Sequence, residues 1–216
     1  MRWDTVLFDL DGTLTDPKVG ITSAAAYALR ELGRGEVDPE TLTDFIGPPL
    51  HVVFPAHCGL DEEETDAAIR AFRVYYVERG WCENIPYEGM AELLDALRAA
   101  GLRLAVATSK PEDTAQKILE HFGLASYFDH ICGSRMGDKA SADKASVVRS
   151  ALACMGDGGS AVMVGDRSYD IVGAHTAGLD AVGVLYGYGS RAELEEAGAD
   201  FIAADLTELQ AILLSE

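Results

Sequence analysis

The sequence predicts an α/β fold in which helices cover both faces of a parallel sheet. Short apolar runs rich in Val, Ile and Phe each stop at a polar residue or a glycine, and a helical pattern follows. Strands that are buried on both faces show such continuous apolar runs, whereas half-exposed strands alternate. The 216 residues, 48% of them apolar, are enough for one sizeable core. The clearest runs cover residues 5–8, 102–107, 161–164 and 181–185.

The helical patterns between these runs carry their own boundary signals. Those over 91–100 and 171–177 both end at a glycine, which readily adopts the left-handed conformation that closes a helix. Near the C-terminus, Asp205 followed three residues later by Glu208 is typical of a capping box that opens a last helix. Strands and helices therefore alternate along most of the chain.

One stretch breaks this alternation and predicts an inserted helical domain. Between the first strand and the strand at 102–107, roughly eighty residues show only helical patterns, although a crossover between parallel strands needs about a dozen residues including its helix. We expect a sheet domain made of 1–15 and 87–216, with a helical insertion over 16–86. The acidic run over 61–66 fits the first turn of a helix, where negative charge complements the helix dipole.

The charge balance and the apolar pattern exclude several classes of protein. Seventeen Lys and Arg against 36 Asp and Glu give a formal net charge of −19, which repels nucleic-acid phosphates and anionic membranes. No apolar run approaches the ~20 residues of a membrane helix, and the N-terminus does not resemble a signal peptide. We expect a cytoplasmic protein, monomeric or homodimeric, that binds neither nucleic acid polymers nor membranes.

The cysteine pattern does not indicate a zinc site. Cys58, Cys82, Cys132 and Cys154 are 24, 50 and 22 positions apart, with no Cys-x-x-Cys pair, and they lie among apolar neighbours. We expect buried free thiols.

Two carboxylates leave the carboxyl end of the first predicted strand. They are Asp9 and Asp11, in the run Asp9-Leu10-Asp11-Gly12-Thr13. In an open α/β sheet, this edge is where ligands bind. Because two neighbouring carboxylates repel each other, we expect a divalent cation or a shared proton between them.

A hydroxyl pair follows the next predicted strand. Thr108 and Ser109 come shortly before Pro111, which suits the first turn of a helix. The free N–H groups of such a helix start bind anions. This segment therefore predicts an anion cradle at the same edge of the sheet.

Two more carboxylates follow the strand at 161–164. Asp166 comes directly after Gly165, and Asp170, four residues later, projects from the start of the following helix. Both can reach the edge at which Asp9 and Asp11 lie.

Lys144 is the candidate cation of the site. It lies in the first turn of a predicted helix that runs to about Ala153, where a cation opposes the helix dipole by ~0.3–1 kcal/mol. A bound phosphate would favour a lysine there. Lys110 and Lys139 are nearby competitors for the same role.

Together these segments resemble the motifs of the haloacid dehalogenase-like phosphohydrolases. Asp9 to Leu14 resembles the first motif, Thr108 the second, Lys144 the third, and Gly165 to Asp170 the fourth. The resemblance covers essentially the whole chain. It implies a Rossmann-like three-layer core with a parallel sheet, and a small α-helical cap inserted after the first motif.

Longer segments are similar to the bacterial branch that is labelled phosphoglycolate phosphatase or 5′-nucleotidase. These segments are 14–22, 45–50, 107–111 and 164–167. Two departures from the branch lie beside the expected site. Tyr169 stands where His is usual, and the segment 135–140 is one residue longer and lacks the usual Arg.

The resemblance implies a Mg²⁺-dependent phosphomonoester hydrolase that acts through an aspartyl-phosphate. Asp9 would be the nucleophile, and Asp11 the general acid and base. Mg²⁺ would be held by Asp9, the carbonyl of Asp11 and Asp166, while Asp170 would orient a bound water or Lys144. The phosphoryl oxygens would be bound by Thr108, Ser109, Lys144 and backbone N–H groups near Gly12.

The helical insertion would exclude water and contact the leaving group of a small phosphorylated metabolite. The candidates for substrate specificity are a stiff turn within the insertion and residues near its hinge. They are Gly47, Pro48, Pro49, Thr15, Asp16 and Lys18.

Two other functions stay open from the sequence. A sugar-phosphate mutase of the same superfamily, similar to β-phosphoglucomutase, would use the same motifs. A receiver-like regulator also gathers acidic residues, a Thr and a Lys around Mg²⁺ on a parallel sheet. Its phospho-acceptor, however, follows a later strand, whereas Asp9 follows the first.

Overall fold

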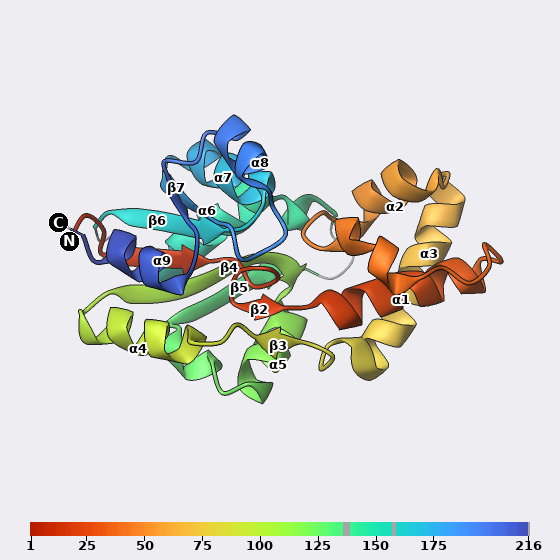
Figure 1. Ribbon diagram of the computed structural model, residues 1–216, viewed down its shortest axis with the longest axis horizontal. Coiled ribbons are helices and arrows are strands. Elements are labelled where there is room, and N and C mark those ends of the chain that lie inside the picture. Colours follow the sequence, from red (N-terminus) through yellow and green to blue (C-terminus); the bar gives the residue numbers. More distant parts are fainter. Residues whose placement is uncertain (136–138, 157–158, 216) are drawn as a thin grey trace. The chain divides into compact units, whose positions relative to one another are not determined.

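The chain folds as two compact units. The computed structural model describes residues 1–135, 139–156 and 159–215 (Figure 1). One unit consists of Met1–Thr15 together with Pro86–Glu216, and the other of Asp16–Ile85. The second unit thus interrupts the first after its first strand. It ends one residue before the limit expected from the sequence.

A six-stranded parallel sheet forms the centre of the first unit, as the sequence predicts. In spatial order its strands are β5 (His130–Ser134), β4 (Arg103–Pro111), β1 (Thr5–Phe8), β6 (Ala161–Gly165), β7 (Asp180–Val184) and β8 (Phe201–Ala203). Because β1 lies between β4 and β6, the strand order reverses its direction at β1. Ligand sites of open α/β sheets form outside the carboxyl ends of the strands at such a switch point.

Helices cover both faces of the sheet and complete three layers. Helices α6, α7 and α8 pack on one face, and α4, α5 and α9 on the other (Figure 1). On the first face, Leu7, Val148 and Ile171 belong to one buried cluster that joins sheet and helices. The helices are α4 (Met90–Ala99), α5 (Glu112–His121), α6 (Lys144–Met155), α7 (Ser168–Thr176), α8 (Arg191–Glu196) and α9 (Leu206–Leu213), with 3₁₀ turns at Ala125–Tyr127 and Lys139–Ala142.

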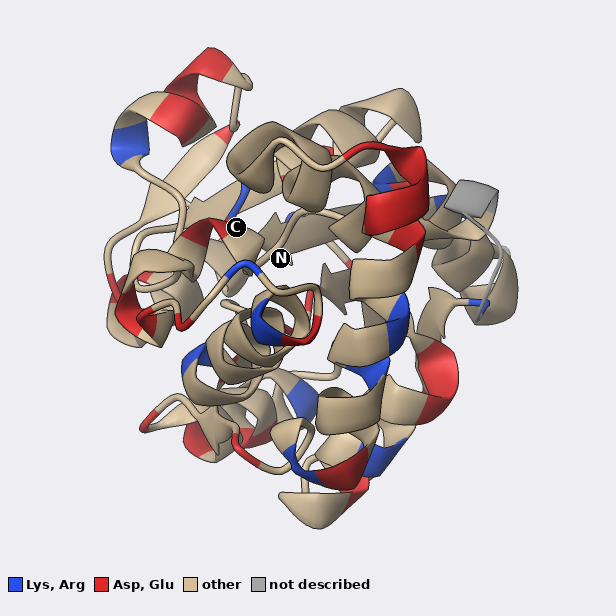
Figure 2. Cartoon of the chain, turned by 90° about the vertical axis from the view of Figure 1, so that its right-hand side faces the viewer, with Lys and Arg blue, Asp and Glu red and all other residues tan. Residues whose placement is uncertain are grey.

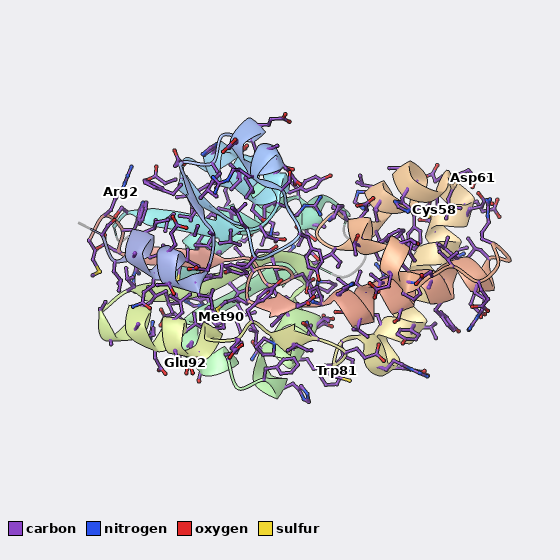
Figure 3. All side chains as sticks on the ribbon, in the orientation of Figure 1. Arg2, Cys58, Asp61, Trp81, Met90 and Glu92 are labelled. Atoms are coloured by element: carbon purple, nitrogen blue, oxygen red, sulfur yellow. The ribbon has the colours of Figure 1, made fainter. Side chains whose placement is uncertain are left out.

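The second unit is helical. It contains α1 (Lys18–Glu31), α2 (Leu50–Cys58) and α3 (Glu62–Tyr75), a π-helical turn (Tyr76–Gly80), and 3₁₀ turns at Pro39–Thr41 and Thr43–Phe45. Two short strands, β2 (Thr15–Asp16) and β3 (Ile85–Pro86), pair where the chain passes between the units. Asp61 caps α3 in a reciprocal pair of hydrogen bonds with Glu64, so the acidic run opens a helix as predicted (Figure 3).

The cysteines are free, and the prediction that they are buried is confirmed for Cys132 but not for the other three. Cys132 on β5 is buried and Cys58 is half-buried, whereas Cys82 and Cys154 are exposed. Cys154 lies in the last turn of α6, and Cys82 follows the π-helical turn. At the ends of helices and turns, a side chain can be exposed even when its neighbours in the sequence are apolar.

Acidic residues occur in both units, and Figure 2 shows them on many segments of the chain. They outnumber the basic ones in each, so the net charge of −19 does not come from one tail or one helix. None of the helices in the described part of the chain combines the length and the apolar character needed to span a bilayer.

Candidate functional site

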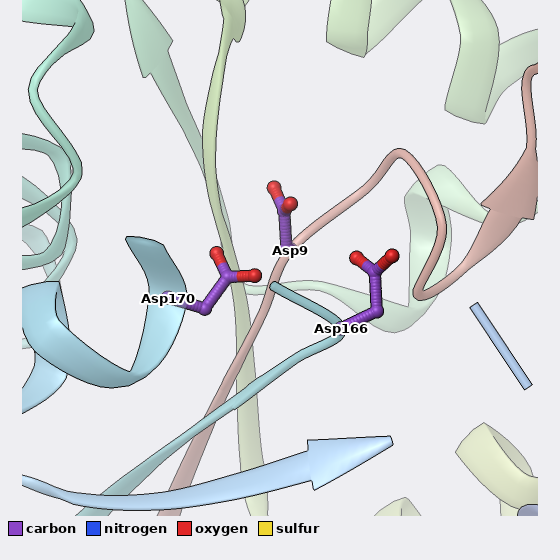
Figure 4. A group of neighbouring side chains, drawn as sticks. All are labelled: Asp9, Asp166 and Asp170. Carbon is purple, nitrogen blue, oxygen red and sulfur yellow. The ribbon is translucent and has the colours of Figure 1, made fainter. Parts of the chain in front are cut away.

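Three buried carboxylates meet at the carboxyl ends of β1 and β6, the switch point of the sheet. Asp9 follows β1, Asp166 follows β6, and Asp170 lies in the first turn of α7 (Figure 4). Each offers a carboxylate oxygen within 4.8 Å of those of the other two. Asp9 is 6% exposed, Asp166 0% and Asp170 1%. The fold therefore brings together carboxylates that are far apart in the sequence.

A glycine lets the loop after β1 approach Asp166 closely. Gly12 has a φ of +83°, in the left-handed region, and a Cβ added there would lie 2.6 Å from the carboxylate carbon of Asp166. The neighbouring hydroxyl of Thr13 donates to Oδ1 of Asp166 at 3.3 Å. The N–H of Gly12 donates to the carbonyl of Thr15 at 2.8 Å, so this N–H is engaged within the loop.

Lys144 joins two of the carboxylates. Its Nζ lies 2.8 Å from Oδ1 of Asp9 and 2.7 Å from Oδ1 of Asp170, and it donates to the carbonyl of Ala107 at 3.2 Å. Asp143 caps α6, so this lysine is the first residue of the helix. Burial alone would lower the pKa of Lys144, but the charges of Asp170 and Asp9 outweigh it and hold the pKa above its ordinary value.

A second lysine pairs with the remaining carboxylate of the first motif. Nζ of Lys110 lies 2.6 Å from Oδ2 and 2.8 Å from Oδ1 of Asp11, and both side chains are largely buried. Burial raises the pKa of Asp11 above its ordinary value, although Lys110 opposes the rise. Lys110 and Lys144 thus serve different carboxylates. The side chain of the third candidate, Lys139, lies outside the described part of the chain.

The hydroxyl pair lies at the carboxyl end of β4. Thr108 is 2% exposed and its Oγ1 accepts the N–H of Lys110 at 3.3 Å, whereas Ser109 is half-buried. Pro111 is the last residue of β4 and the cap of α5, rather than a residue of the first helical turn as expected. The carbonyl that precedes Thr108 accepts from Lys144, so the hydroxyl pair adjoins that ammonium along the chain.

The pKa values of Asp166 and Asp170 are raised because both carboxyl groups are buried. Burial raises the pKa of Asp166 well above its ordinary value, and the charge of Asp170 adds to this. Burial also raises the pKa of Asp170 to about 6, although Lys144 opposes the rise. Among the described side chains, the four carboxylates of Asp9, Asp11, Asp166 and Asp170 form ion pairs with two ammonium groups, those of Lys110 and Lys144. The buried charges of this group therefore do not balance.

This donor set fits a hard divalent cation. Mg²⁺ prefers carboxylate oxygens, and its two positive charges would offset the excess negative charge of the group. Asp170 is the least available of the three as a ligand, because its Oδ1 forms an ion pair with Lys144 while its Oδ2 accepts the N–H of Arg167 at 3.0 Å. The two oxygens of Asp166 instead accept neutral hydrogen bonds, from Thr13 and Tyr188. Asp9 and Asp166 would therefore be the better placed ligands, and Asp170 lies where it could orient Lys144.

Cation binding is expected to weaken at low pH. Burial and the charge of Asp170 hold the pKa of the proposed ligand Asp166 well above its ordinary value, so protons compete with the cation as the pH falls. We therefore expect the Kd for Mg²⁺ to be higher at pH 5 than at pH 7.5. Calorimetry in buffers of different ionisation enthalpy should also show proton release on binding.

The same shifts set the sign of the pH effect on stability without metal. The folded chain holds these protons more tightly than the unfolded chain, so its free energy of unfolding should fall as the pH rises from about 4 through 6. Mg²⁺ should restore stability above that range, and more at pH 7.5 than at pH 5. An equal gain from Mg²⁺ at both pH values would contradict this assignment.

The specificity candidates lie at the boundary between the units and in the second unit. Thr15 is the last residue of the N-terminal segment of the first unit and is fully buried. The carboxylate of Asp16 accepts the N–H of Lys18 at 2.9 Å, and Nζ of Lys18 pairs with Glu40 at 2.6 Å. The turn that precedes α2 consists of Gly47, Pro48 and Pro49.

The two departures from the related branch lie near the site in the sequence. Tyr169 precedes Asp170 in the first turn of α7 and is 42% exposed. Within the segment 135–140, residues 136–138 lie outside the described part of the chain. At its edge, the N–H of Arg135 donates to the hydroxyl of Ser141 at 2.8 Å.

Sequence reasoning missed the segment between β7 and α8. The N–H of Tyr188 donates to Oδ2 of Asp166 at 2.8 Å. Glu193 accepts from Nε of Arg167 at 3.0 Å. The sequence pattern that could have indicated this segment is the alternation Tyr186-Gly187-Tyr188-Gly189, which follows the apolar strand and Leu185.

Comparisons with known proteins agree with this geometry. A model of the haloacid dehalogenase-like hydrolase family matches residues 6–184. The chain is 40% identical over 216 residues to a 5′-nucleotidase of Pseudomonas aeruginosa, covering 100% of this chain and 97% of the relative. It is 34% identical over 188 residues to a phosphoglycolate phosphatase of Agrobacterium fabrum, covering 84% and 80%.

One similar protein is named as a kinase and not as a phosphatase. The chain is 41% identical over 211 residues to the tyrosine-protein kinase PtkA of Mycobacterium tuberculosis, covering 96% of this chain and 72% of the relative. Among solved structures, that of a predicted phosphatase from Clostridium acetobutylicum matches with a TM-score of 0.93 and 42% identity, over 99% of each chain.

Proposed function

The chain belongs to the haloacid dehalogenase-like hydrolases and is a phosphatase; we propose that it hydrolyses small phosphomonoesters with Mg²⁺, through an aspartyl-phosphate on Asp9. The observation that carries the proposal is the meeting of Asp9, Asp166 and Asp170 at the switch point of the sheet, with Lys144 paired to Asp9 and Asp170. The sheet unit acts as the catalytic core, and the helical unit as a cap.

Asp9 begins the reaction by attacking phosphorus. One carboxylate oxygen forms a bond to phosphorus, and the bond from phosphorus to the leaving oxygen breaks, which divides one difficult displacement into two easier ones. Lys144 lies 2.8 Å from Oδ1 of Asp9, so it orients the nucleophile and balances charge on the phosphoryl oxygens. Thr108 and Ser109, at the end of β4, are further donors to these oxygens.

Asp11 handles the protons of both steps. In the first step it gives a proton to the leaving oxygen, and in the second it takes one from the water that attacks phosphorus, which releases phosphate and restores Asp9. When bound by Asp9, Asp166 and the carbonyl of Asp11, Mg²⁺ would screen these carboxylates from the incoming phosphate dianion. Asp170 keeps Lys144 in place through its 2.7 Å contact.

The ion pair of Lys110 with Asp11 predicts an effect that depends on the leaving group. Lys110→Met leaves Asp11 without its cation, so we expect kcat/KM for an alkyl phosphate to fall about 10- to 100-fold. For p-nitrophenyl phosphate the loss should be much smaller, because nitrophenolate leaves without a proton. The exposed Lys117 on α5 gives the control, Lys117→Met. Equal losses of kcat/KM with both substrates would show that Lys110 does not support the proton transfer by Asp11.

The substrate class follows from the site together with the relatives. The names 5′-nucleotidase and phosphoglycolate phosphatase both describe release of phosphate from a small phosphomonoester, and we propose such a metabolite as substrate. The test is a phosphate-release screen over some dozens of phosphometabolites with Mg²⁺, ranked by kcat/KM because that ratio reports discrimination. Release from none of them, with Mg²⁺ bound, would overturn the proposal.

Phosphoryl transfer to tyrosine is a second candidate, favoured by the similarity to PtkA. It is the weaker one, because this chain covers 72% of that relative but 97% of the 5′-nucleotidase. Labelled ATP distinguishes them: a kinase yields phosphotyrosine, whereas a phosphatase yields free phosphate from its substrate. Product analysis on β-glucose 1-phosphate likewise distinguishes a mutase, which yields an isomer.

A further inference from the structure

A segment outside the four motifs contacts the proposed metal ligand Asp166 from several sides. This segment, residues 186–193, runs from the end of β7 into α8, and we call it the strap. The mechanism above assigns it no step. All of its contacts described below lie within the first unit.

The strap fixes one oxygen of Asp166. The N–H of Tyr188 donates to Oδ2 at 2.8 Å, while the hydroxyl of Thr13, from the loop after β1, donates to Oδ1 at 3.3 Å. With one hydrogen bond on each oxygen, rotation of the carboxylate would break at least one of them. Each oxygen can still accept a second partner, because a carboxylate offers about four acceptor positions.

Two glycines let the strap backbone lie against this carboxylate. A Cβ on Gly187 would overlap the carbonyl oxygen of Gly12 and the side chain of Asp166. A Cβ on Gly189 would overlap the backbone carbonyl of Asp166. The strap backbone therefore lies against the loops that follow β1 and β6 at a distance that only glycine allows.

Tyr186 ties the strap to the loop after β1. Its hydroxyl donates to the carbonyl of Thr13 at 3.1 Å, and its ring packs edge-on against Tyr87, with centroids 4.9 Å apart. Tyr87 in turn donates its N–H to the carbonyl of Leu14 at 3.2 Å. The backbone carbonyls of Thr13 and Leu14 thus accept hydrogen bonds from Tyr186 and Tyr87, respectively.

The far end of the strap holds the residues that follow Asp166. Oε1 of Glu193 accepts from Nε of Arg167 at 3.0 Å and from the N–H of Ser168 at 2.9 Å. The hydroxyl of Ser190 accepts the N–H of Glu193 at 3.1 Å and caps α8. The start of α8 thus anchors the segment between Asp166 and α7.

We propose that the strap is a positioning element of the cation site, which sets the orientation of Asp166 and its distance from Asp9. Residues that orient metal ligands contribute to affinity because the ligands then need not reorganise on binding. The proposal rests on the proposed function in one respect: Asp9 and Asp166 must bind the cation. Tyr186 and Gly187 are its most testable residues.

The test measures Mg²⁺ binding by calorimetry without substrate, in the full chain. Tyr186→Phe removes one hydroxyl and keeps the ring, so we expect the Kd for Mg²⁺ to rise about 3- to 10-fold. Gly187→Ala forces Asp166 to move, and we expect a rise of about 10- to 100-fold. For Tyr186→Phe, kcat at saturating Mg²⁺ should return to within about twofold of the wild-type value, because the hydroxyl acts through the cation.

Two matched variants control for general packing effects. Tyr127→Phe removes a hydroxyl that contacts Asp95, away from Asp166. Gly20→Ala creates a similar overlap with the carbonyl of Gly80 inside the second unit. Both should keep the Kd for Mg²⁺ within about twofold of the wild-type value.

The outcomes separate the two proposals. If the wild-type chain binds Mg²⁺ and Tyr186→Phe binds it equally well, the strap has no positioning role, whatever its effect on thermal stability. If Tyr186→Phe lowers kcat at saturating Mg²⁺ with an unchanged Kd, the strap acts elsewhere and the proposal is wrong. If the wild-type chain binds no Mg²⁺, the metal assignment of the proposed function fails first. Because Tyr186→Phe is a mild change, the test does not depend on the folding of Gly187→Ala.

Discussion

Replacing Asp9 with asparagine is expected to lower kcat for phosphate release by at least ~10⁴-fold, because an amide cannot form the aspartyl-phosphate. Asparagine has nearly the same shape, and Lys144 keeps its 2.7 Å contact with Asp170. The variant should therefore fold, with a free energy of unfolding within ~1 kcal/mol of the wild-type value in the absence of Mg²⁺. Steady-state kinetics on p-nitrophenyl phosphate and urea unfolding measure the two effects.

The control for this variant is an aspartate outside the site. Asp95 lies on α4, where its carboxylate accepts from the hydroxyl of Tyr127 at 3.3 Å. Asp95→Asn should keep its full turnover. If Asp9→Asn, purified free of host phosphatases, retains more than ~1% of wild-type turnover, Asp9 is not the nucleophile.

Removing the ammonium of Lys144 is expected to have the largest effect on stability. Lys144→Met leaves Asp9 and Asp170 buried without their cation, and breaking a buried pair in this way costs about 3–5 kcal/mol. The loss should be greatest at pH 7.5 without Mg²⁺ and smaller at pH 5. Without the opposing charge of Lys144, the pKa of Asp170 rises further in the folded variant, so at low pH this carboxyl takes up a proton and loses its charge.

Activity should fall with this variant as well. Loss of a positive charge at the phosphoryl oxygens lowers kcat by about 10²–10³-fold. Urea unfolding at the two pH values, with steady-state kinetics, measures both effects, and Lys117→Met on the exposed side of α5 should change neither. A stability loss that is equal at pH 5 and pH 7.5 would show that Lys144 stabilises the fold by packing and not by its charge.

The central strands could be predicted because their chemistry is local. β1, β4, β6 and β7 contain buried apolar runs, and a polar residue or a glycine marks where the runs of β1, β4 and β6 end. The acidic residues after β1 and β6 could therefore be assigned to one edge of the sheet before any contact was known. For that reason, most residues of the candidate site could be proposed from the sequence.

The edge strands could not be predicted in the same way. β5 (His130–Ser134) mixes polar residues and a glycine with its apolar ones, and β8 (Phe201–Ala203) has only three residues. Helix α2 (Leu50–Cys58) forms although Pro55 lies inside it. In these elements the tertiary contacts outweigh the local pattern.

The ion-pair partners of the two lysines, and the contacts of the strap, also could not be predicted from the sequence. Lys110 lies near the end of β4 and Lys144 at the start of α6. Only the fold shows that Lys110 pairs with Asp11 and Lys144 with Asp9. The hydroxyl of Tyr186 and the carbonyl of Thr13 come from residues 173 positions apart. No local pattern reports a contact of that range.

The central claim, that Asp9 carries the phosphoryl group between substrate and water, is tested most directly by trapping. Wild-type protein with Mg²⁺ is mixed with ³²P-labelled substrate, quenched in acid within milliseconds, and mapped by peptide. The account predicts a transient acyl-phosphate on the peptide that contains Asp9, formed at least as fast as kcat and absent from Asp9→Asn. Turnover without any covalent label, or a label on a different residue, would contradict it.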